Sequence, residues 1–204
     1  MSPARNTPAP HGKGGALHRR EVVQRLLADR GDLLVIAGLG APAWDITAAG
    51  DHPLSFPMWG AMGGAAMMGL GLALAQPKRR VLVVTGDGEM LMGLGSLATI
   101  AVQRPHNLSI VVLDNERYGE TGMQKTHTAY GVDLAGMARA AGFSIARQIR
   151  TMAGLARLVA LVYRGNGPVF AQVKVAAEKP SLVLPPKDGA MLKARFRAAL
   201  SGGT

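Results

Sequence analysis

Short runs of apolar, mostly β-branched residues alternate along the chain with longer stretches in which apolar positions recur at helical spacing. The clearest run, residues 80–85 (RVLVVT), is unbroken apolar at its centre, as expected of a strand covered on both faces. Similar runs predict further strands at 33–36, 108–113, 144–149 and 168–175. The segments between them predict helices at 17–30, 61–75, 91–103, 134–141 and 152–163, the last two capped by Asp133 and Thr151. The alternation is typical of parallel βαβ units and predicts an α/β fold, a doubly wound parallel sheet with helices on both faces.

Composition divides the chain into a core and two ends. Residues 1–16 are rich in Pro and Gly and have no apolar stretch typical of a secretory signal, which predicts a flexible basic tail. The core, residues 17–180, has the length of one α/β domain. Residues 181–204 predict a linker and a basic C-terminal helix capped by Asp188, which we expect to pack on a partner or to fray.

The overall composition narrows the class of protein. Of the 204 residues, 48% are hydrophobic and 18% charged, a balance that excludes extensive disorder. The chain has no cysteine, which excludes disulfides, thiolate metal sites and thiol nucleophiles and is usual for an intracellular protein. The longest strongly apolar stretch, residues 61–75, is shorter than the ~20 residues needed to cross a bilayer. We therefore expect a cytoplasmic protein with no membrane partner.

The net charge of +10 raises the question of nucleic acid binding. However, residues 21–133 hold eight basic and eleven acidic residues, and nearly all the motifs discussed below lie within them. The aromatic residues number only nine (two Trp, three Tyr and four Phe), and none alternates with basic residues. We predict no nucleic acid partner, so the basic ends are expected to be solvated faces or to meet an acidic partner chain.

Candidate chemistry gathers at the ends of two predicted strands. Gly86-Asp87-Gly88 follows the strand at 80–85 and precedes a helix, and Asn115 lies just after the strand at 108–113. If these strands are neighbours, the Asp87 carboxylate and the Asn115 amide oxygen converge at the sheet edge where α/β proteins bind ligands. Two oxygen ligands beside a helix N-terminus, whose N–H groups bind phosphate, predict a Mg²⁺–diphosphate site. An Asp-Gly pair alone is a common turn, so this prediction depends on the combination.

The segment that joins these residues, GDGEMLMGLGSLATIAVQRPHNLSIVVLDN, resembles the cofactor signature of thiamine-diphosphate-dependent enzymes, and Asn115 follows Asp87 by 28 residues. The segments FPMWGAMGGAAMMGLGLAL, LMGLGSLATI and TGMQKTHT are similar to the β subunit of sulfopyruvate decarboxylases and the C-terminal half of phosphonopyruvate decarboxylases. The resemblance covers residues 17–180. It implies a subunit of a carboxy-lyase that uses thiamine diphosphate and Mg²⁺ to convert a small 2-oxo acid into an aldehyde and CO₂.

The resemblance also implies which residues bind the cofactor and the metal. Asp87, Asn115 and the main-chain carbonyl of Arg117 are expected to bind Mg²⁺. The diphosphate is expected to be lined by Gly86, Gly88 and Glu89.

Two further groups of residues follow from the same resemblance. The Gly60 carbonyl and the Met62 N–H are expected to hold the aminopyrimidine ring, with the Met62 side chain wedged under a bent cofactor. In the loop after Asn115, Thr121, Gln124 and His127 are candidate catalytic residues, with His127 as a general acid. A core methionine and a solvated loop histidine are the alternatives for Met62 and His127.

The family's essential glutamate lies on a separate pyrimidine-binding domain, and no second α/β domain fits into 204 residues. The resemblance therefore implies a partner α subunit that supplies this glutamate, in an α₂β₂ or larger hetero-oligomer with the cofactor at the interface. The helix expected at 61–75 and the basic segments are candidate interface regions.

Two residues depart from the family pattern. Glu120 stands where the family commonly has serine, and a carboxylate there repels a sulfonate or phosphonate unless Lys125 or another cation neutralises it. Glu89 stands where the family usually has a small residue, and we expect it to point to solvent or to cap the helix through backbone N–H groups. Both changes affect the substrate assignment more than the cofactor assignment.

Other functions stay open at this stage. With the same cofactor, the enzyme could be an acetolactate-synthase-like carboligase or an aldehyde-oxidising subunit, and without enzymatic activity the chain would be a basic α/β binding module. A dinucleotide site at Gly38-x-Gly40-x-x-Ala43 is disfavoured, because Pro42 and a turn at Pro53 are expected to interrupt any helix there and no acid follows about 20 residues on.

Overall fold

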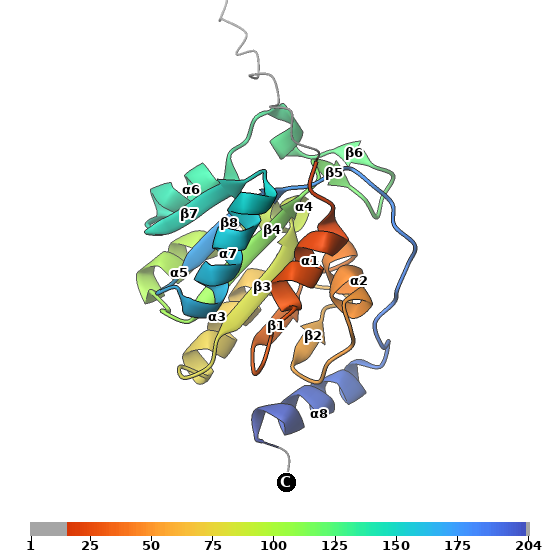
Figure 1. Cartoon of the computed structure of the whole chain (residues 1–204), viewed down its shortest axis with the longest axis vertical. Coiled ribbons are helices and arrows are strands. Elements are labelled where there is room, and N and C mark those ends of the chain that lie inside the picture. The colour runs from red at the N-terminus through yellow and green to blue at the C-terminus, as the bar shows by residue number, and fades with distance from the viewer. Residues whose placement is uncertain (1–15, 203–204) are drawn as a thin grey trace, which may run out of the picture.

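The computed structural model describes residues 16–202 and shows a six-stranded sheet between two layers of helices (Figure 1). All neighbouring strands are parallel, in the order β2-β1-β3-β4-β8-β7. The strands are β1 (Leu34–Ala37), β2 (Ser55–Pro57), β3 (Val81–Gly86), β4 (Leu108–Asp114), β7 (Ile145–Ile149) and β8 (Val169–Lys174). The predicted doubly wound parallel sheet is confirmed. The expected basic tail, residues 1–16, lies outside the described residues except for its last position.

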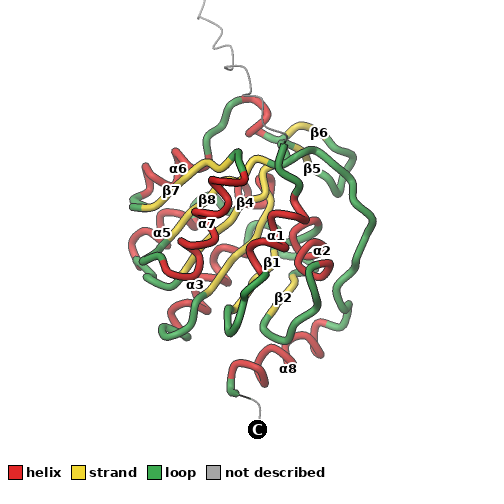
Figure 2. Tube along the Cα trace, viewed as in Figure 1, coloured by secondary structure: helices red, strands yellow, loops and turns green. Residues whose placement is uncertain are grey.

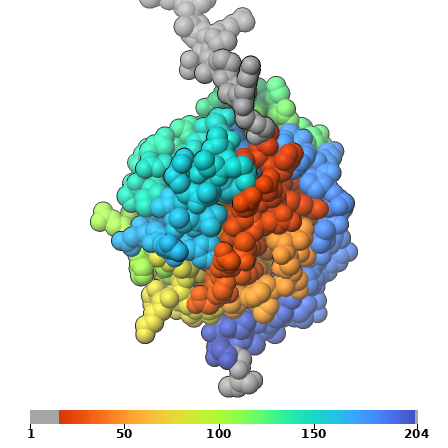
Figure 3. Space-filling model, in the orientation of Figure 1, coloured from red at the N-terminus to blue at the C-terminus, as the bar shows by residue number. Residues whose placement is uncertain are grey.

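Helices cover both faces of the sheet. One face carries α1 (Arg19–Leu27), α2 (Ala41–Ala48) and α7 (Met152–Arg164), which lie in front in Figures 1 and 3, with α1 between the other two. The other face carries α3 (Ala65–Ala75), α5 (Ser96–Gln103) and α6 (Leu134–Ala141). In β3, Val81 and Val83 pack into one core and Leu82 and Val84 into the other, which explains the unbroken apolar run. No helix within residues 16–202 combines the length and the apolar character needed to traverse a bilayer.

Two helices differ in their bounds from those predicted, because the backbone at Gly63 lies against the backbone at Gly93. The segment expected to be helical from 91 to 103 forms α4 (Asp87–Met92) and α5, separated at Gly93. A Cβ atom at residue 93 would lie 2.1 Å from the Gly63 carbonyl oxygen, so this contact requires glycine. The helix expected from residue 61 begins at Ala65, because Ala61 and Gly63 have φ angles of +56° and +96° that a helix cannot contain.

A helix and a strand that were not predicted follow β1. The expectation that Pro42 interrupts any helix there is wrong, because Pro42 lies in the first turn of α2, where no backbone N–H is needed. After α2 the chain turns at Pro53 and enters the short edge strand β2. The chain thus passes from β1 to β2, which lies on one side of β1, and then to β3, which lies on the other side of β1.

The C-terminal helix, α8 (Gly189–Leu200), packs against the chain's own sheet edge, so the expectation that it frays is wrong, whereas contact with a partner stays a prediction. The Phe196 side chain is 8% exposed, and its ring lies edge-on to Phe56 of β2 with centroids 5.7 Å apart. Arg195 pairs with Asp51 through two contacts of 2.6 and 2.9 Å. The linker between β8 and α8 follows the outside of the molecule (Figure 2), and Asp188 caps the helix as predicted.

Replacing Phe196 by Ala is expected to lower the free energy of unfolding by about 3 kcal/mol, the low end for loss of a buried Phe because this site lies at the sheet edge. Urea unfolding measures the change. The matched control is Arg197→Ala, an exposed neighbour on the same helix, which is expected to change stability by less than about 0.5 kcal/mol. Equal effects of the two substitutions would contradict the packing of α8 on the sheet.

Candidate functional site

A cavity of about 260 Å³ lies at the carboxyl ends of the strands, where the chain reverses its direction across the sheet between β1 and β3. In open α/β sheets this switch point is the usual ligand site. The cavity is lined by residues after β1, β3 and β4, and by Arg19 at the start of α1. Among its lining residues are the sequence-predicted Met62, Gly86, Asp87, Gly88, Glu89, Asn115, Arg117 and Thr121.

Asp87 is held at the cavity by two threonines of the loop after β4. Its side chain is 1% exposed, and Oδ2 accepts a hydrogen bond from the Thr126 hydroxyl. The Thr128 hydroxyl lies 3.1 Å from the same oxygen and 2.8 Å from Oδ1 of Asp114, and can donate its one hydrogen to either. Both threonines therefore face Oδ2, and no side chain among residues 16–202 donates to Oδ1.

The electrostatic setting of Asp87 favours a cation. Burial, and secondarily the charge of Asp114, raise the pKa of Asp87 from 3.8 to about 6, although the two threonine hydroxyls oppose the rise. A divalent cation at Oδ1, which has no side-chain donor within residues 16–202, would offset both the burial and the repulsion between the carboxylates.

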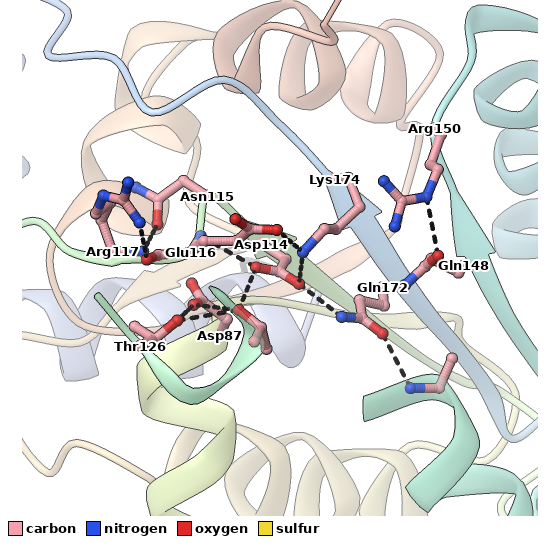
Figure 4. Close-up of polar contacts among 12 residues, drawn as sticks. Asp87, Asp114, Asn115, Glu116, Arg117, Thr126, Gln148, Arg150, Gln172 and Lys174 are labelled. Carbon is pink, nitrogen blue, oxygen red and sulfur yellow. Dashed lines mark hydrogen bonds and ion pairs between the residues drawn. The ribbon is translucent and has the colours of Figure 1, made fainter. Parts of the chain in front are cut away.

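Asp114 at the end of β4 links Asp87 to the neighbouring strand (Figure 4). Its Oδ2 accepts hydrogen bonds from Gln172 Nε2 at 2.6 Å and Lys174 Nζ at 2.8 Å, both from β8. Lys174 also pairs with Glu116 at 2.5 Å. This buried polar network was not predicted, although glutamine and lysine near the end of an otherwise apolar strand are a signal that could have indicated it.

Two successive side-chain bonds shape the chain immediately after β4. Oδ1 of Asp114 accepts from the Glu116 amide at 3.1 Å, and Oδ1 of Asn115 accepts from the Arg117 amide at 2.9 Å. Glu116 has φ +62°, a left-handed conformation that the bonds to its neighbours hold in place. An amide oxygen has two lone pairs, so Asn115 keeps one for a further ligand.

The predicted long loop, residues 115–130, contains a small hairpin of β5 (Arg117–Tyr118) and β6 (Gln124–Lys125), followed by the 3₁₀ helix η1 (His127–Tyr130). The hairpin packs on the turn after β3, since a Cβ atom at Gly88 would lie 2.5 Å from the Tyr118 ring. A Cβ atom at Gly86 would meet no atom of residues 16–202 within 4 Å. The backbone at Gly86 is therefore open to a ligand.

The Glu89 carboxylate does not point to solvent, as one expectation had it, and it forms no ion pair within residues 16–202. Its carboxylate is buried, accepts a hydrogen bond from the Thr85 hydroxyl at 2.7 Å, and packs on the backbone at Gly38. Burial raises the pKa of Glu89, and Thr85 and the backbone of Leu39, Gly63 and Ala65 oppose the rise. The carboxylate thus faces the turns after β1 and before α3.

Three predicted site residues do not line the cavity. Gly60 is exposed, and within the described part of the chain a Cβ atom there would have no neighbour closer than 4 Å. Gln124 is exposed and exchanges hydrogen bonds of 2.9 and 3.0 Å with Thr121. His127 is exposed on η1. The roles assigned to these three residues, and to those that do line the cavity, stay predictions.

The cavity contains residues that the sequence did not single out as site residues, chiefly Arg19 and Tyr118. Glu120, expected to affect the substrate, lines it as well. Lys125, expected to neutralise Glu120, is exposed and lies over the Tyr130 ring at 5.6 Å, outside the lining.

The family model for "Thiamine pyrophosphate enzyme, C-terminal TPP binding domain" matches residues 41–173, from the start of α2 to one residue before the end of β8. The chain belongs to this family. Thiamine pyrophosphate is another name for thiamine diphosphate, so the family resemblance given above is confirmed, and Gly86-Asp87-Gly88 and Asn115 lie inside the matched region.

Relatives of this thiamine pyrophosphate enzyme agree with that assignment. The chain is 39% identical to sulfopyruvate decarboxylase subunit beta of Methanothermobacter thermautotrophicus, over 92% of this chain and 98% of that one. It is 36% identical to phosphonopyruvate decarboxylase of Streptomyces viridochromogenes, over 88% of this chain and 45% of that one. The crystal structure of benzoylformate decarboxylase from Polynucleobacter necessarius shares the fold, with a TM-score of 0.63 and 17% identity over 87% of this chain and 36% of that one.

Proposed function

We propose that this chain is the diphosphate- and Mg²⁺-binding subunit of a thiamine-diphosphate-dependent 2-oxo acid decarboxylase of the sulfopyruvate or phosphonopyruvate decarboxylase type. The observation that carries the proposal is the meeting of Asp87 and Asn115, from the ends of adjacent strands, in one cavity at the switch point of the sheet. The family assignment and the similarity to decarboxylases support it.

The residues present fit a metal-bound diphosphate. Asp87 Oδ1 has no side-chain donor among residues 16–202, Asn115 keeps a lone pair, and Arg117, whose main-chain carbonyl is the third expected ligand, lines the same cavity. The first amides of α4 and the side-chain-free Gly86 would receive the phosphate oxygens. When bound, thiamine diphosphate supplies the electron sink that allows a 2-oxo acid to lose CO₂. Met62, which lines the cavity, would contact its organic part.

A partner subunit is part of the proposal. The relative that is matched over 98% of its length is named as a beta subunit. Two exposed apolar side chains, Met62 and Met92, line the cavity. Trp59, Met67 and Met68, from α3 and the segment before it, are exposed as well. Exposed apolar side chains that continue into a binding site favour docking of another chain there, which would bring the expected glutamate of an α subunit to the cofactor in an α₂β₂ or larger assembly.

The experiment starts with native and denaturing mass spectrometry of the complex purified gently from its source. We expect a second chain of similar size and thiamine diphosphate released in a Mg²⁺-dependent manner. CO₂ and aldehyde release are then measured with pyruvate, sulfopyruvate and phosphonopyruvate, for this chain alone and for the complex. Only the complex is expected to turn over.

Each other outcome changes a particular part of the proposal. Turnover by this chain alone would contradict the need for a partner. A complex that retains no cofactor even with added Mg²⁺ would return the chain to the class of binding modules. An acyloin-type or oxidised product would keep the cofactor and replace decarboxylation by carboligation or aldehyde oxidation.

A further inference from the structure

A buried arginine lies in the wall of the cavity. Arg19, the first residue of α1, is 4% exposed, yet it lines the cavity together with Glu120 and the turn after β1. Its Nε atom is buried and has no hydrogen-bond partner among residues 16–202, whereas Nη1 forms an ion pair with Asp45. An arginine side chain is charged throughout the physiological pH range and has five N–H donors, so a buried guanidinium with unused donors is costly unless a ligand satisfies it.

Arg19 shares its ion-pair partner with a second arginine. Nη1 of Arg19 lies 2.9 Å from Oδ2 of Asp45 in α2, but Nε of Arg20 lies 3.1 Å from the other oxygen of the same buried carboxylate. Two guanidinium groups thus share one carboxylate. Arg20 already ties α1 to α2 through a hydrogen bond of good geometry, and it does not line the cavity. Because Arg20 already joins the two helices, a role in joining them does not explain why Arg19 is buried beside Asp45.

The charge of Arg19 acts on the cavity. It lowers the pKa of the Glu120 carboxyl, although partial burial raises that pKa by more. Glu120 in turn packs on the backbone at Gly40, next to the turn after β1. Arg19 is thus the cation that the sequence required beside Glu120 if an anion is to enter, a role that had been expected of Lys125.

We propose that Arg19 binds an oxyanion of the reacting molecules inside the cavity. This rests on the proposed function, which supplies two such groups, the diphosphate of the cofactor and the carboxylate of the 2-oxo acid. Both offer a pair of negatively charged oxygens that a planar guanidinium binds through parallel hydrogen bonds. In either case the positive charge of Arg19 offsets the negative charge of Glu120, so that Glu120 repels an anionic ligand less.

Arg19→Gln tests the proposal, with Arg20→Gln as the matched control. Each substitution removes one of the two cations on Asp45, but only the first changes the cavity wall. Binding of inorganic pyrophosphate with Mg²⁺ is measured by isothermal titration calorimetry on the purified complex. KM and kcat for 2-oxo acid turnover are measured on the same samples with pyruvate as the probe. Loss of a charge-assisted hydrogen bond is expected to weaken binding by about tenfold or more.

The two arms distinguish the source of the oxyanion. Weaker pyrophosphate binding in Arg19→Gln, with Arg20→Gln close to wild type, supports a diphosphate contact. Unchanged pyrophosphate binding with a raised KM and a similar kcat supports a carboxylate contact. Equal behaviour of the two variants in both arms overturns the proposal.

Two further results keep the test decisive. If Arg19→Gln does not fold, Arg19→Lys keeps the charge beside Asp45 and loses the planar fork, so wild-type values in both arms for this variant overturn the proposal. In the second result, the wild-type complex binds pyrophosphate, Arg19→Gln weakens that binding, and the wild-type complex binds no thiamine diphosphate. This result would contradict the proposed function and would still support the oxyanion site at Arg19.

Discussion

Replacing Asp87 by Asn is expected to abolish Mg²⁺-dependent retention of thiamine diphosphate while it stabilises the cofactor-free chain. Loss of a group that only orients a metal ligand costs about 10- to 100-fold in metal affinity, so loss of a charged ligand itself is expected to cost about 100-fold or more. The asparagine has the same shape and can still accept from Thr126, so the fold is expected to persist. Equilibrium dialysis with labelled cofactor, with and without Mg²⁺, measures the loss.

The gain in stability follows from the sign of the pKa shift. Because the pKa of Asp87 is about 6 in the folded chain and 3.8 ordinarily, the folded state favours the protonated form. The stabilisation is full below pH ~4 and lost as the pH rises through ~6, a shift of about two units that corresponds to at most about 3 kcal/mol. Since Asn stays neutral, we expect the variant in EDTA at pH 7.5 to be more stable than wild type by about 1–2 kcal/mol.

Urea unfolding in EDTA at pH 5 and pH 7.5 measures this difference, which is expected to shrink at the lower pH. The matched control is Asp188→Asn, the same chemical change at the exposed N-cap of α8, where asparagine caps equally well. The control is expected to change neither cofactor retention nor the pH profile. Undiminished retention in Asp87→Asn would remove Asp87 from the metal site, and lower stability at pH 7.5 would contradict its unfavourable charged state.

The parts of the fold that the sequence predicted depend on residues that are close to one another along the chain. The apolar run of β3 identifies a strand covered on both faces wherever it lies in the sheet. Asp133 and Thr151 accept from the amides of Gly136 and Gly154, three residues on, so each helix start is marked within its own first turn. By contrast, the break at Gly93 exists because a distant turn contacts it, which no local pattern indicates.

The same division applies to the cavity. Asp87 and Asn115 could be placed together because each directly follows a strand and parallel strands end at the same edge. Thr126 and Thr128 lie beyond a hairpin whose path the sequence does not determine, and Arg19 reaches the cavity from a helix on one face of the sheet. The sequence therefore did not predict the cavity residues that come from another layer of the fold or from beyond the hairpin.

The second large effect is expected at Lys174, whose side chain is 13% exposed and pairs with both Asp114 and Glu116. Lys174→Met keeps most of the apolar stem and removes the ammonium group, so the fully buried Asp114 keeps only neutral partners: Gln172, Thr128 and the Glu116 amide. Breaking a buried ion pair on one side costs about 3–5 kcal/mol, and we expect a loss of stability in that range by urea unfolding at pH 7.5. The control is Lys125→Met, an exposed lysine over an aromatic ring, with an expected change of less than about 1 kcal/mol.

A double-mutant cycle separates the lost pair from lost packing. In Lys174→Met/Asp114→Asn the buried position 114 is neutral, and an asparagine whose oxygen accepts from Gln172 Nε2 can donate an N–H to the Thr128 hydroxyl oxygen. Most of the lost stability is therefore expected to return, although the partly exposed Glu116 has lost its lysine partner. Additive losses would instead show that Lys174 acts through its stem or through Glu116. Because Asp114 also holds the Glu116 amide and its charge acts on Asp87, the single variant is expected to lose cofactor retention as well, and the double variant to regain part of it. A cycle in which stability and retention recover together would make the strand-to-strand network around Asp114 the support on which the metal ligands rest.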